Sequence, residues 1–135
     1  MIKNILISML IFIIYCSTMD AQSCFTGYEF KTEGTASDNS RTIDIILFWD
    51  ISKVSGKDNF KMQAEIQPLN NCWQSLNGSL RSEKVTHDLT SKNYKGQMTL
   101  RFEDLNSKCL KWRIKMTNSM SRCEEYTPWK FESLL

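Results

Sequence analysis

Apolar and polar residues alternate along most of this chain with a period of two, which is the spacing of strands rather than of helices. The cleanest example lies in the C-terminal third, where apolar residues alternate with charged or polar ones: Leu110, Trp112, Ile114 and Met116 with Lys111, Arg113, Lys115 and Thr117. Such a segment buries one face of a strand and exposes the other. The pattern therefore predicts a half-buried strand at 110–117.

Three further strands follow from the same pattern in the N-terminal half. Tyr28 and Phe30 mark a short first strand. Residues 43–50 form a second strand that is apolar on both faces, as in the centre of a sheet. Residues 60–66 alternate again, and Pro68 is expected to end this third strand because proline has no N–H to donate to a neighbour.

The remaining segments complete an all-β pattern. Residues 98–103 alternate, and residues 126–131 suit a last strand at a sheet edge because of Pro128. Residues 79–96 fit either a short strand or a helical turn. About seven short strands without a strongly amphipathic helix predict one domain, an antiparallel β-sandwich. A short helical cytokine is the alternative fold, which the repeated alternation disfavours.

Residues 1–21 have the organisation of a secretory signal peptide. A lysine near the start precedes an apolar run of about eleven residues, too short to cross a bilayer of roughly 30 Å as a helix. Cleavage is expected after Ala21, with Ser17 and Thr18 as alternatives, and it leaves a sandwich domain at 22–135. An uncleaved membrane anchor is the other interpretation.

The cysteine count agrees with export. Cleavage removes Cys16 and leaves an even number of cysteines, which predicts two disulfides in a short exported chain: Cys24, Cys72, Cys109 and Cys123. A metal site is the alternative, but the chain has no CxxC pair and one histidine, so we expect no metal. Asn77, Gly78 and Ser79 form an N-glycosylation sequon, which predicts an exposed turn with a glycan on Asn77.

Charge and length narrow the function classes. The formal net charge is only +2, whereas a nucleic-acid-binding domain needs a concentrated basic patch, so this class of partner is not expected. No segment after the signal peptide is apolar enough to span a membrane. We therefore expect a secreted, extracellular protein whose length supports one hydrophobic core.

Two segments resemble the fibronectin type III family, including its cytokine-receptor-like branch. The second strand of that family tends to read apolar-x-apolar-x-Trp, and the next strand begins aromatic-x-apolar, as do Ile45, Leu47 and Trp49, then Phe60 and Met62. The spacing of the sixth strand is similar to that of Leu110, Trp112, Ile114, Met116 and Asn118. The family tyrosine of this strand has no counterpart here. The resemblance implies a receptor-like, immunoglobulin-like sandwich.

The resemblance also implies a disulfide pattern. In such a sandwich the third and sixth strands are antiparallel neighbours, so Cys72 lies beside Cys109. The first and last strands run parallel as neighbours, which brings Cys24 near Cys123. We expect this nested pairing, with the sequential pairing of Cys24 to Cys72 and Cys109 to Cys123 as the alternative. Both bridges are expected to stabilise the fold rather than to act in redox chemistry.

Catalytic chemistry is hard to assemble from these residues. The single histidine, His87, precedes an aspartate, but no serine lies in a GxSxG elbow. Adjacent carboxylates at 103–104 and 124–125 would point to opposite faces of a strand and would not converge on one substrate. The chain has no phosphate-binding glycine loop, HExxH or calcium loop. We expect no enzyme activity and no cofactor.

The tryptophans divide into two kinds. Trp49 and Trp112 share the register of core-facing residues and are expected in the core. Trp73 and Trp129 lie outside that register and are candidate anchors for a protein partner or a sugar ring. The alternative is that they cap the two ends of the sandwich.

Basic residues form a second candidate surface. Pairing of the third and sixth strands would place their outward side chains on one flat, net-basic face that carries Lys61, Lys111, Arg113 and Lys115. Such a face suits an acidic protein or a sulfated glycan, because an arginine can bind a carboxylate with two hydrogen bonds. A merely solvated face is the alternative.

These observations together favour a secreted, non-enzymatic binding module that engages an extracellular protein, acidic or glycan-bearing. One alternative is a carrier of a lipid or other apolar ligand between the sheets, with methionines in its wall: Met62, Met98 and Met116. Another alternative is a carbohydrate-binding domain that uses Trp73 or Trp129 as a platform. The sequence does not distinguish oligomeric states.

Overall fold

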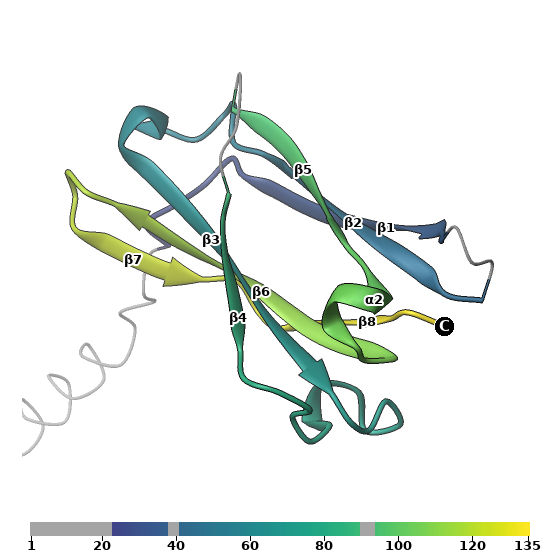
Figure 1. Ribbon diagram of the computed structural model, residues 1–135. Coiled ribbons are helices and arrows are strands. Elements are labelled where there is room, and N and C mark those ends of the chain that lie inside the picture. The colour runs from purple at the N-terminus through teal and green to yellow at the C-terminus, as the bar shows by residue number, and fades with distance from the viewer. Residues whose placement is uncertain (1–22, 38–40, 90–93) are drawn as a thin grey trace, which may run out of the picture.

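A computed structural model describes residues 23–37, 41–89 and 94–135, so the predicted signal peptide and its cleavage site lie outside the described residues (Figure 1). The described strands are β1 (Glu29–Ala36), β2 (Ile43–Asp50), β3 (Phe60–Leu69), β4 (Val85–Leu89), β5 (Lys95–Leu100), β6 (Cys109–Asn118), β7 (Cys123–Tyr126) and β8 (Lys130–Ser133). The short helical segments are η2 (Lys57–Asn59), η3 (Ser75–Asn77) and α2 (Phe102–Leu105). The prediction of an all-β fold is confirmed.

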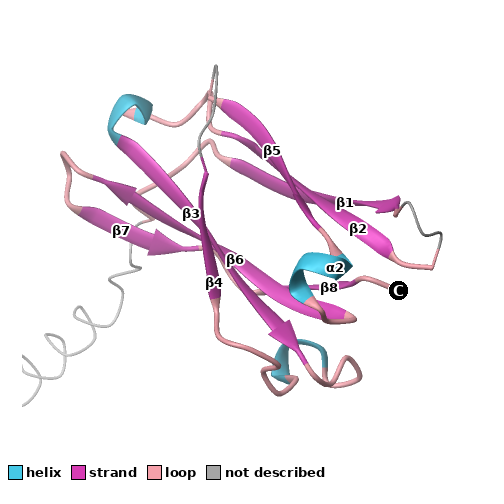
Figure 2. Cartoon of the chain, viewed as in Figure 1, coloured by secondary structure: helices cyan, strands magenta, loops and turns pink. Residues whose placement is uncertain are grey.

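The strands assemble into two antiparallel sheets that face each other as a sandwich (Figure 2). The smaller sheet has the order β1-β2-β5, and the larger has the order β4-β3-β6-β7, with β8 also paired to β6. Strands β3 and β6 are antiparallel neighbours over their whole length, from Phe60 opposite Asn118 to Leu69 opposite Cys109. This central pair places the outward side chains of β3 and β6 side by side on one face of the larger sheet.

The last predicted strand is divided in the structure. Strand β7 pairs with the end of β6, and β8 pairs with its beginning. Between them, Thr127 donates its N–H to the carbonyl of Ile114 and accepts the N–H of Ile114 through its hydroxyl. Pro128 follows and has no N–H, so the regular ladder stops there and resumes at Lys130.

Two local predictions were wrong. Strand β3 does not end before Pro68 but continues to Leu69. The carbonyl of Pro68 accepts from the N–H of Arg81, which precedes β4, so the missing N–H of Pro68 faces the β4 side and the pairing with β6 does not need it. Residues 102–105 form α2 rather than a strand end, with acidic residues in the first turn and Asn106 in a left-handed conformation after the last.

The core lies between the inner faces of the two sheets, and every second residue of the central strands contributes to it. Trp49 and Trp112 are buried there, as predicted. The indole of Trp49 lies over Gly96 on β5, where an added Cβ would be 2.3 Å from its Cζ2 atom. A glycine at this position is therefore required by the packing of Trp49. Met62 and Met116 are also buried in this core.

The nested disulfide pairing is confirmed: Cys24 is bonded to Cys123, and Cys72 to Cys109. The first bridge joins the N-terminal segment to β7 at one end of the sandwich, and the second joins the chain after β3 to the start of β6 at the other. The expectation that the first and last strands are parallel neighbours was wrong, because β1 and β8 belong to different sheets. They touch through Lys130 Nζ, which donates to the carbonyl of Phe30.

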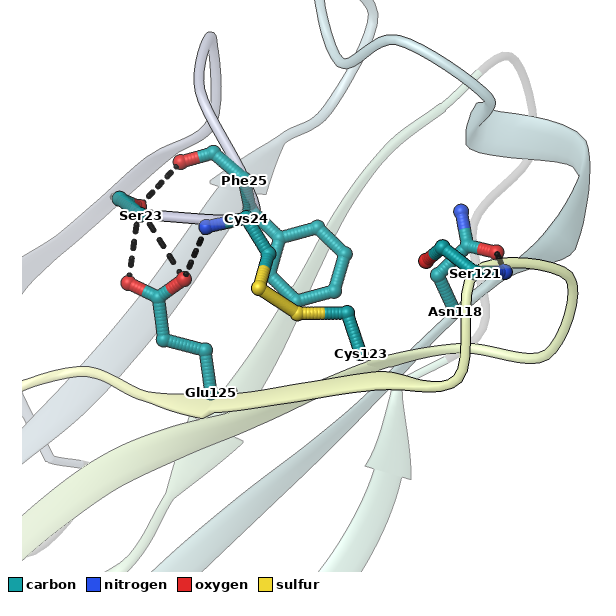
Figure 3. The surroundings of a disulfide bond; sticks show 7 residues. All are labelled: Ser23, Cys24, Phe25, Asn118, Ser121, Cys123 and Glu125. Atoms are coloured by element: carbon teal, nitrogen blue, oxygen red, sulfur yellow. Dashed lines mark hydrogen bonds between the residues drawn. A yellow bond between two sulfur atoms is a disulfide. The ribbon is translucent and has the colours of Figure 1, made fainter. Parts of the chain in front are cut away.

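The Cys24–Cys123 bridge is reinforced by Glu125 (Figure 3). Its carboxylate accepts hydrogen bonds from the hydroxyl of Ser23, at 2.9 and 3.1 Å, and from the N–H of Cys24, at 3.1 Å. Glu124 instead pairs with Lys115 on the opposite face of β7. These neighbouring carboxylates thus point to opposite faces of the strand, as predicted.

Candidate functional site

The chain between β3 and β4, residues 70–84, forms a tightly hydrogen-bonded loop at one end of the sandwich, the lower end in Figure 1. We call it the β3–β4 loop. Its base is closed by the N–H of Asn70, which donates to the carbonyl of Ser79 at 2.8 Å. Successive turns follow, in which Ser75, Asn77 and Gly78 each donate to the carbonyl three residues earlier. The loop is therefore held by its own backbone.

A disulfide pins this loop to the core. Cys72 lies within the loop, and its partner Cys109 is fully buried at the start of β6. The Cα atoms of the two residues are 5.8 Å apart. The bridge fixes the next residue, Trp73, whose N–H donates to the side-chain oxygen of Asn71 at 3.0 Å. The backbone of Trp73 is thus constrained by the neighbouring bridge and by this hydrogen bond.

The side chain of Trp73 nevertheless contacts almost nothing. Trp73 is 99% exposed, whereas most large apolar residues on the central strands are buried. Two leucines of the same loop are also exposed, Leu76 and Leu80. An apolar group of this size on a rigid support is typical of an interaction site rather than of a cap that closes the core. The capping alternative for Trp73 is not supported.

Trp129 is placed differently, in a row of cations and aromatic rings on the outer face of β6, β7 and β8. The guanidinium carbon of Arg113 lies 4.5 Å from the ring centroid of Trp129 and 4.2 Å from that of Tyr126. Lys111 lies over Trp129 at 5.2 Å, and Lys115 lies over Tyr126 at 5.7 Å. We call these five residues the cation–aromatic row. The cationic groups of the row thus partly cover the two aromatic rings.

A buried carboxylate underlies this row. Glu65 on β3 is only 3% exposed, although it lies on the outward register of the strand. Its two oxygens accept from Lys84 Nζ and Arg113 Nε, both at 2.6 Å. Burial alone would raise the pKa of Glu65, but the hydrogen bonds and charges of Lys84 and Arg113 lower it below its ordinary value. Glu65 therefore stays ionised and anchors both cations.

The charge of this face is partly neutralised from within. Lys115 pairs with Glu124 at 2.9 Å, which raises the pKa of the lysine and lowers that of the glutamate. Gln63 and Asp88 are hydrogen-bonded to each other. Cations still outnumber carboxylates on the described outer face: Lys61, Lys84, Lys111, Arg113 and Lys115 against Glu65, Asp88 and Glu124. The face is net-basic, as predicted, but Arg113 already donates its Nε to Glu65.

The loop and the outer face form one continuous surface. Lys111 Nζ, which covers Trp129, also donates to the carbonyl of Leu76 in the β3–β4 loop at 3.2 Å. Helix η3 of the loop lies against β8. The predicted binding residues Trp129, Lys111, Arg113 and Lys115 therefore share this outer face, and the loop that carries Trp73 adjoins it. Lys61 lies at the far end of the same face, opposite Thr117.

Two residues of this surface were missed by sequence reasoning. Tyr126 begins the segment predicted as the last strand, and Glu65 lies on the polar face of the predicted third strand. Alternation carries no signal for either role, because it states which face a side chain occupies but not what covers that face. Their partners come from three strands that are distant in sequence.

Neither the single histidine nor the metal-ligating residue types form a cluster in the part of the chain that the structure describes. His87 is exposed on β4, and its neighbour Asp88 is engaged with Gln63. Among these residues, no three histidines, cysteines, aspartates or glutamates come together as a metal site would require. The described helices are also all too short or too polar to cross a membrane.

Comparison of the chain with models of protein families, with curated proteins and with solved structures gives no match. The surface has to be interpreted from its own geometry.

Proposed function

We propose that this chain is a secreted, non-enzymatic binding module that engages an extracellular protein through the β3–β4 loop. The observation that carries the proposal is the almost complete exposure of Trp73 on a backbone pinned by the Cys72–Cys109 disulfide. The two disulfides and the absence of a membrane-crossing helix among the described residues are compatible with an extracellular location. The fibronectin type III resemblance is part of the proposal, and the antiparallel pairing of β3 with β6 supports it.

The energetics of such an anchor favour binding. Burying a tryptophan at the centre of an interface typically contributes about 2 to 4 kcal/mol. Much of the ordering cost of binding is met in advance here, because the backbone of Trp73 is held by the disulfide and by Asn71. Leu76 and Leu80 extend the apolar area around it. The loop thus has the properties of a preorganised anchor.

The chemistry of the adjoining face indicates the kind of partner. Lys111 and Arg113 bring positive charge next to the loop. Lys84, the last residue of the loop, adds a further positive charge where the chain enters β4. A partner with an apolar pocket bordered by carboxylates or acidic glycans would complement this arrangement. We expect the cations to accelerate association and to make it salt-dependent, while Trp73 slows dissociation.

The proposal is tested with a matched pair of variants. Trp73→Ala removes the anchor, and Met120→Ala removes another exposed apolar side chain, 77% exposed, from the β6–β7 turn at the other end of the sandwich. The protein and both variants, produced in a host that attaches no N-glycans, are used as bait in extracellular fluid, with chemical crosslinking and mass spectrometry. A partner captured by the wild type and by Met120→Ala, and lost with Trp73→Ala, supports the proposal. Capture that is unaffected by Trp73→Ala, or no capture at micromolar bait, contradicts it.

Carbohydrate binding is a second candidate, because an exposed indole is also a platform for sugar rings. Binding on a glycan array that disappears with Trp73→Ala and persists with Met120→Ala would favour this function over a protein partner. The carrier alternative depends on Met62 and Met116, which are buried in the core, and on Met98, which is partly buried against it. Ligand mass retained by the exported protein in native mass spectrometry would support it.

A further inference from the structure

The glycosylation sequon lies on the same pinned loop as the exposed tryptophan. Asn77 follows Trp73 by four residues, and the turn from Gln74 to Asn77 is closed by a backbone hydrogen bond of 3.0 Å. A turn of this kind brings its end residues within about 7 Å, so the Cα atoms of Trp73 and Asn77 are separated by at most roughly 11 Å. Their side chains extend from one small, rigid element.

The side-chain amide of Asn77 is available for modification. Asn77 is exposed, and within the described ranges none of the hydrogen bonds involves its side chain. The backbone N–H of Asn77 donates to the carbonyl of Gln74, and the N–H of Gly78 donates to the carbonyl of Ser75. The loop therefore keeps its shape without the side chain of Asn77. A glycan attached here would begin on the same pinned turn as Trp73, whose indole contacts almost nothing of the protein.

We propose that an N-glycan on Asn77 folds back over Trp73 and competes with the partner for that ring. The second half of this inference rests on the proposed function, whereas the first half rests on the geometry of the loop alone. The C–H groups on one face of a sugar ring and the flat apolar face of an indole lose exposure to water when they meet. The first N-acetylglucosamine is tethered to the loop, so it meets the indole at a high effective concentration.

Whether Asn77 carries a glycan then decides which group the β3–β4 loop presents to a partner. The glycosylated form presents sugar at the β3–β4 loop, and the unglycosylated form presents the bare indole of Trp73. A partner that needs Trp73 binds the second form more tightly. Partial glycosylation would produce two populations of the protein with different affinities from one sequence.

The test uses the full chain exported from a eukaryotic host, with hydroxyl-radical footprinting of Trp73 as the readout. Ser79→Ala removes the sequon but keeps Asn77, and the carbonyl of residue 79 remains to accept from Asn70. Ser79→Thr, at the same position, keeps the sequon and is the matched control. Met120, on the opposite end of the sandwich, serves as an internal standard for oxidation in every sample.

We expect Trp73 to be oxidised several-fold more slowly in the wild type and in Ser79→Thr than in Ser79→Ala, with equal oxidation of Met120. Protection should persist after an endoglycosidase trims the glycan to its first sugar. An unmodified Asn77, equal oxidation of Trp73 in all forms, or loss of protection after trimming would overturn the inference. If protection is observed but no partner is found, the covering of Trp73 stands and the proposed function fails. If a partner binds all forms equally, competition is refuted.

Discussion

Replacing Glu65 with glutamine would remove the single negative charge that Lys84 and Arg113 share beneath the outer face. The carboxylate accepts one short hydrogen bond from each cation, and its side chain is 4% exposed, against 39% for Lys84 and 27% for Arg113. Hydrogen bonds to charged groups contribute about 1.5 to 3 kcal/mol each to stability. Because both cations can regain water, we discount their sum and expect a loss of about 2 kcal/mol in the free energy of unfolding.

The pH dependence of this loss follows from the direction of the pKa shift. The pKa of Glu65 lies below its ordinary value of 4.5 in the folded state. Its contribution is therefore complete above that ordinary value and is lost as the pH falls through the folded value, because the unfolded chain takes up the proton first. The difference between the wild type and Glu65→Gln is expected to be largest at neutral pH and to shrink below about pH 5.

Urea unfolding followed by tryptophan fluorescence, with the disulfides intact, measures this difference at about pH 7 and about pH 3. Glu124→Gln is the matched control, because it removes a carboxylate from a solvent-exposed pair with Lys115 and should lower the free energy of unfolding much less than Glu65→Gln does. Wild-type stability of Glu65→Gln at neutral pH, or an equal deficit at both pH values, would show that the buried charge does not act as the geometry implies.

Three further predictions concern the core, the bridge and the loop. Gly96→Ala would force a Cβ to within 2.3 Å of Trp49 and should lower the free energy of unfolding by about 1 to 3 kcal/mol in a urea titration; an unchanged midpoint would contradict the packing of Trp49. Joint replacement of Cys72 and Cys109 by alanine opens a loop with a sequence separation of 37 and should cost about 4 kcal/mol, measured in the same way, whereas a loss below 1 kcal/mol would mean that the bridge constrains little. Trp73→Ala should leave the melting temperature unchanged within about 2 °C, since the ring is exposed; a large decrease in calorimetry would show that it packs on the fold.

Periodicity located the strands and their buried faces because it reports a local property. In a strand the side chains point alternately to two sides, so the residues that must leave water, such as Trp49 and Trp112, share a register whatever the partner strand is. Local signals were misleading where a neighbour changed their meaning. Pro68 does not end β3, because its missing N–H faces the β4 side of the strand and is not needed for the pairing with β6.

The sequence by itself determined the fold class, the core register, the exposed sequon and, with the family resemblance, the disulfide pairing. Only the tertiary structure decided that Trp73 and Trp129, which alternation leaves equally outside the core, have opposite environments. Trp129 is covered by Lys111 and Arg113, whereas Trp73 is held out in solvent. The physical reason is that such environments depend on contacts between segments distant in the chain, such as Arg113 on β6 with Glu65 on β3, and a periodic pattern carries no record of those contacts.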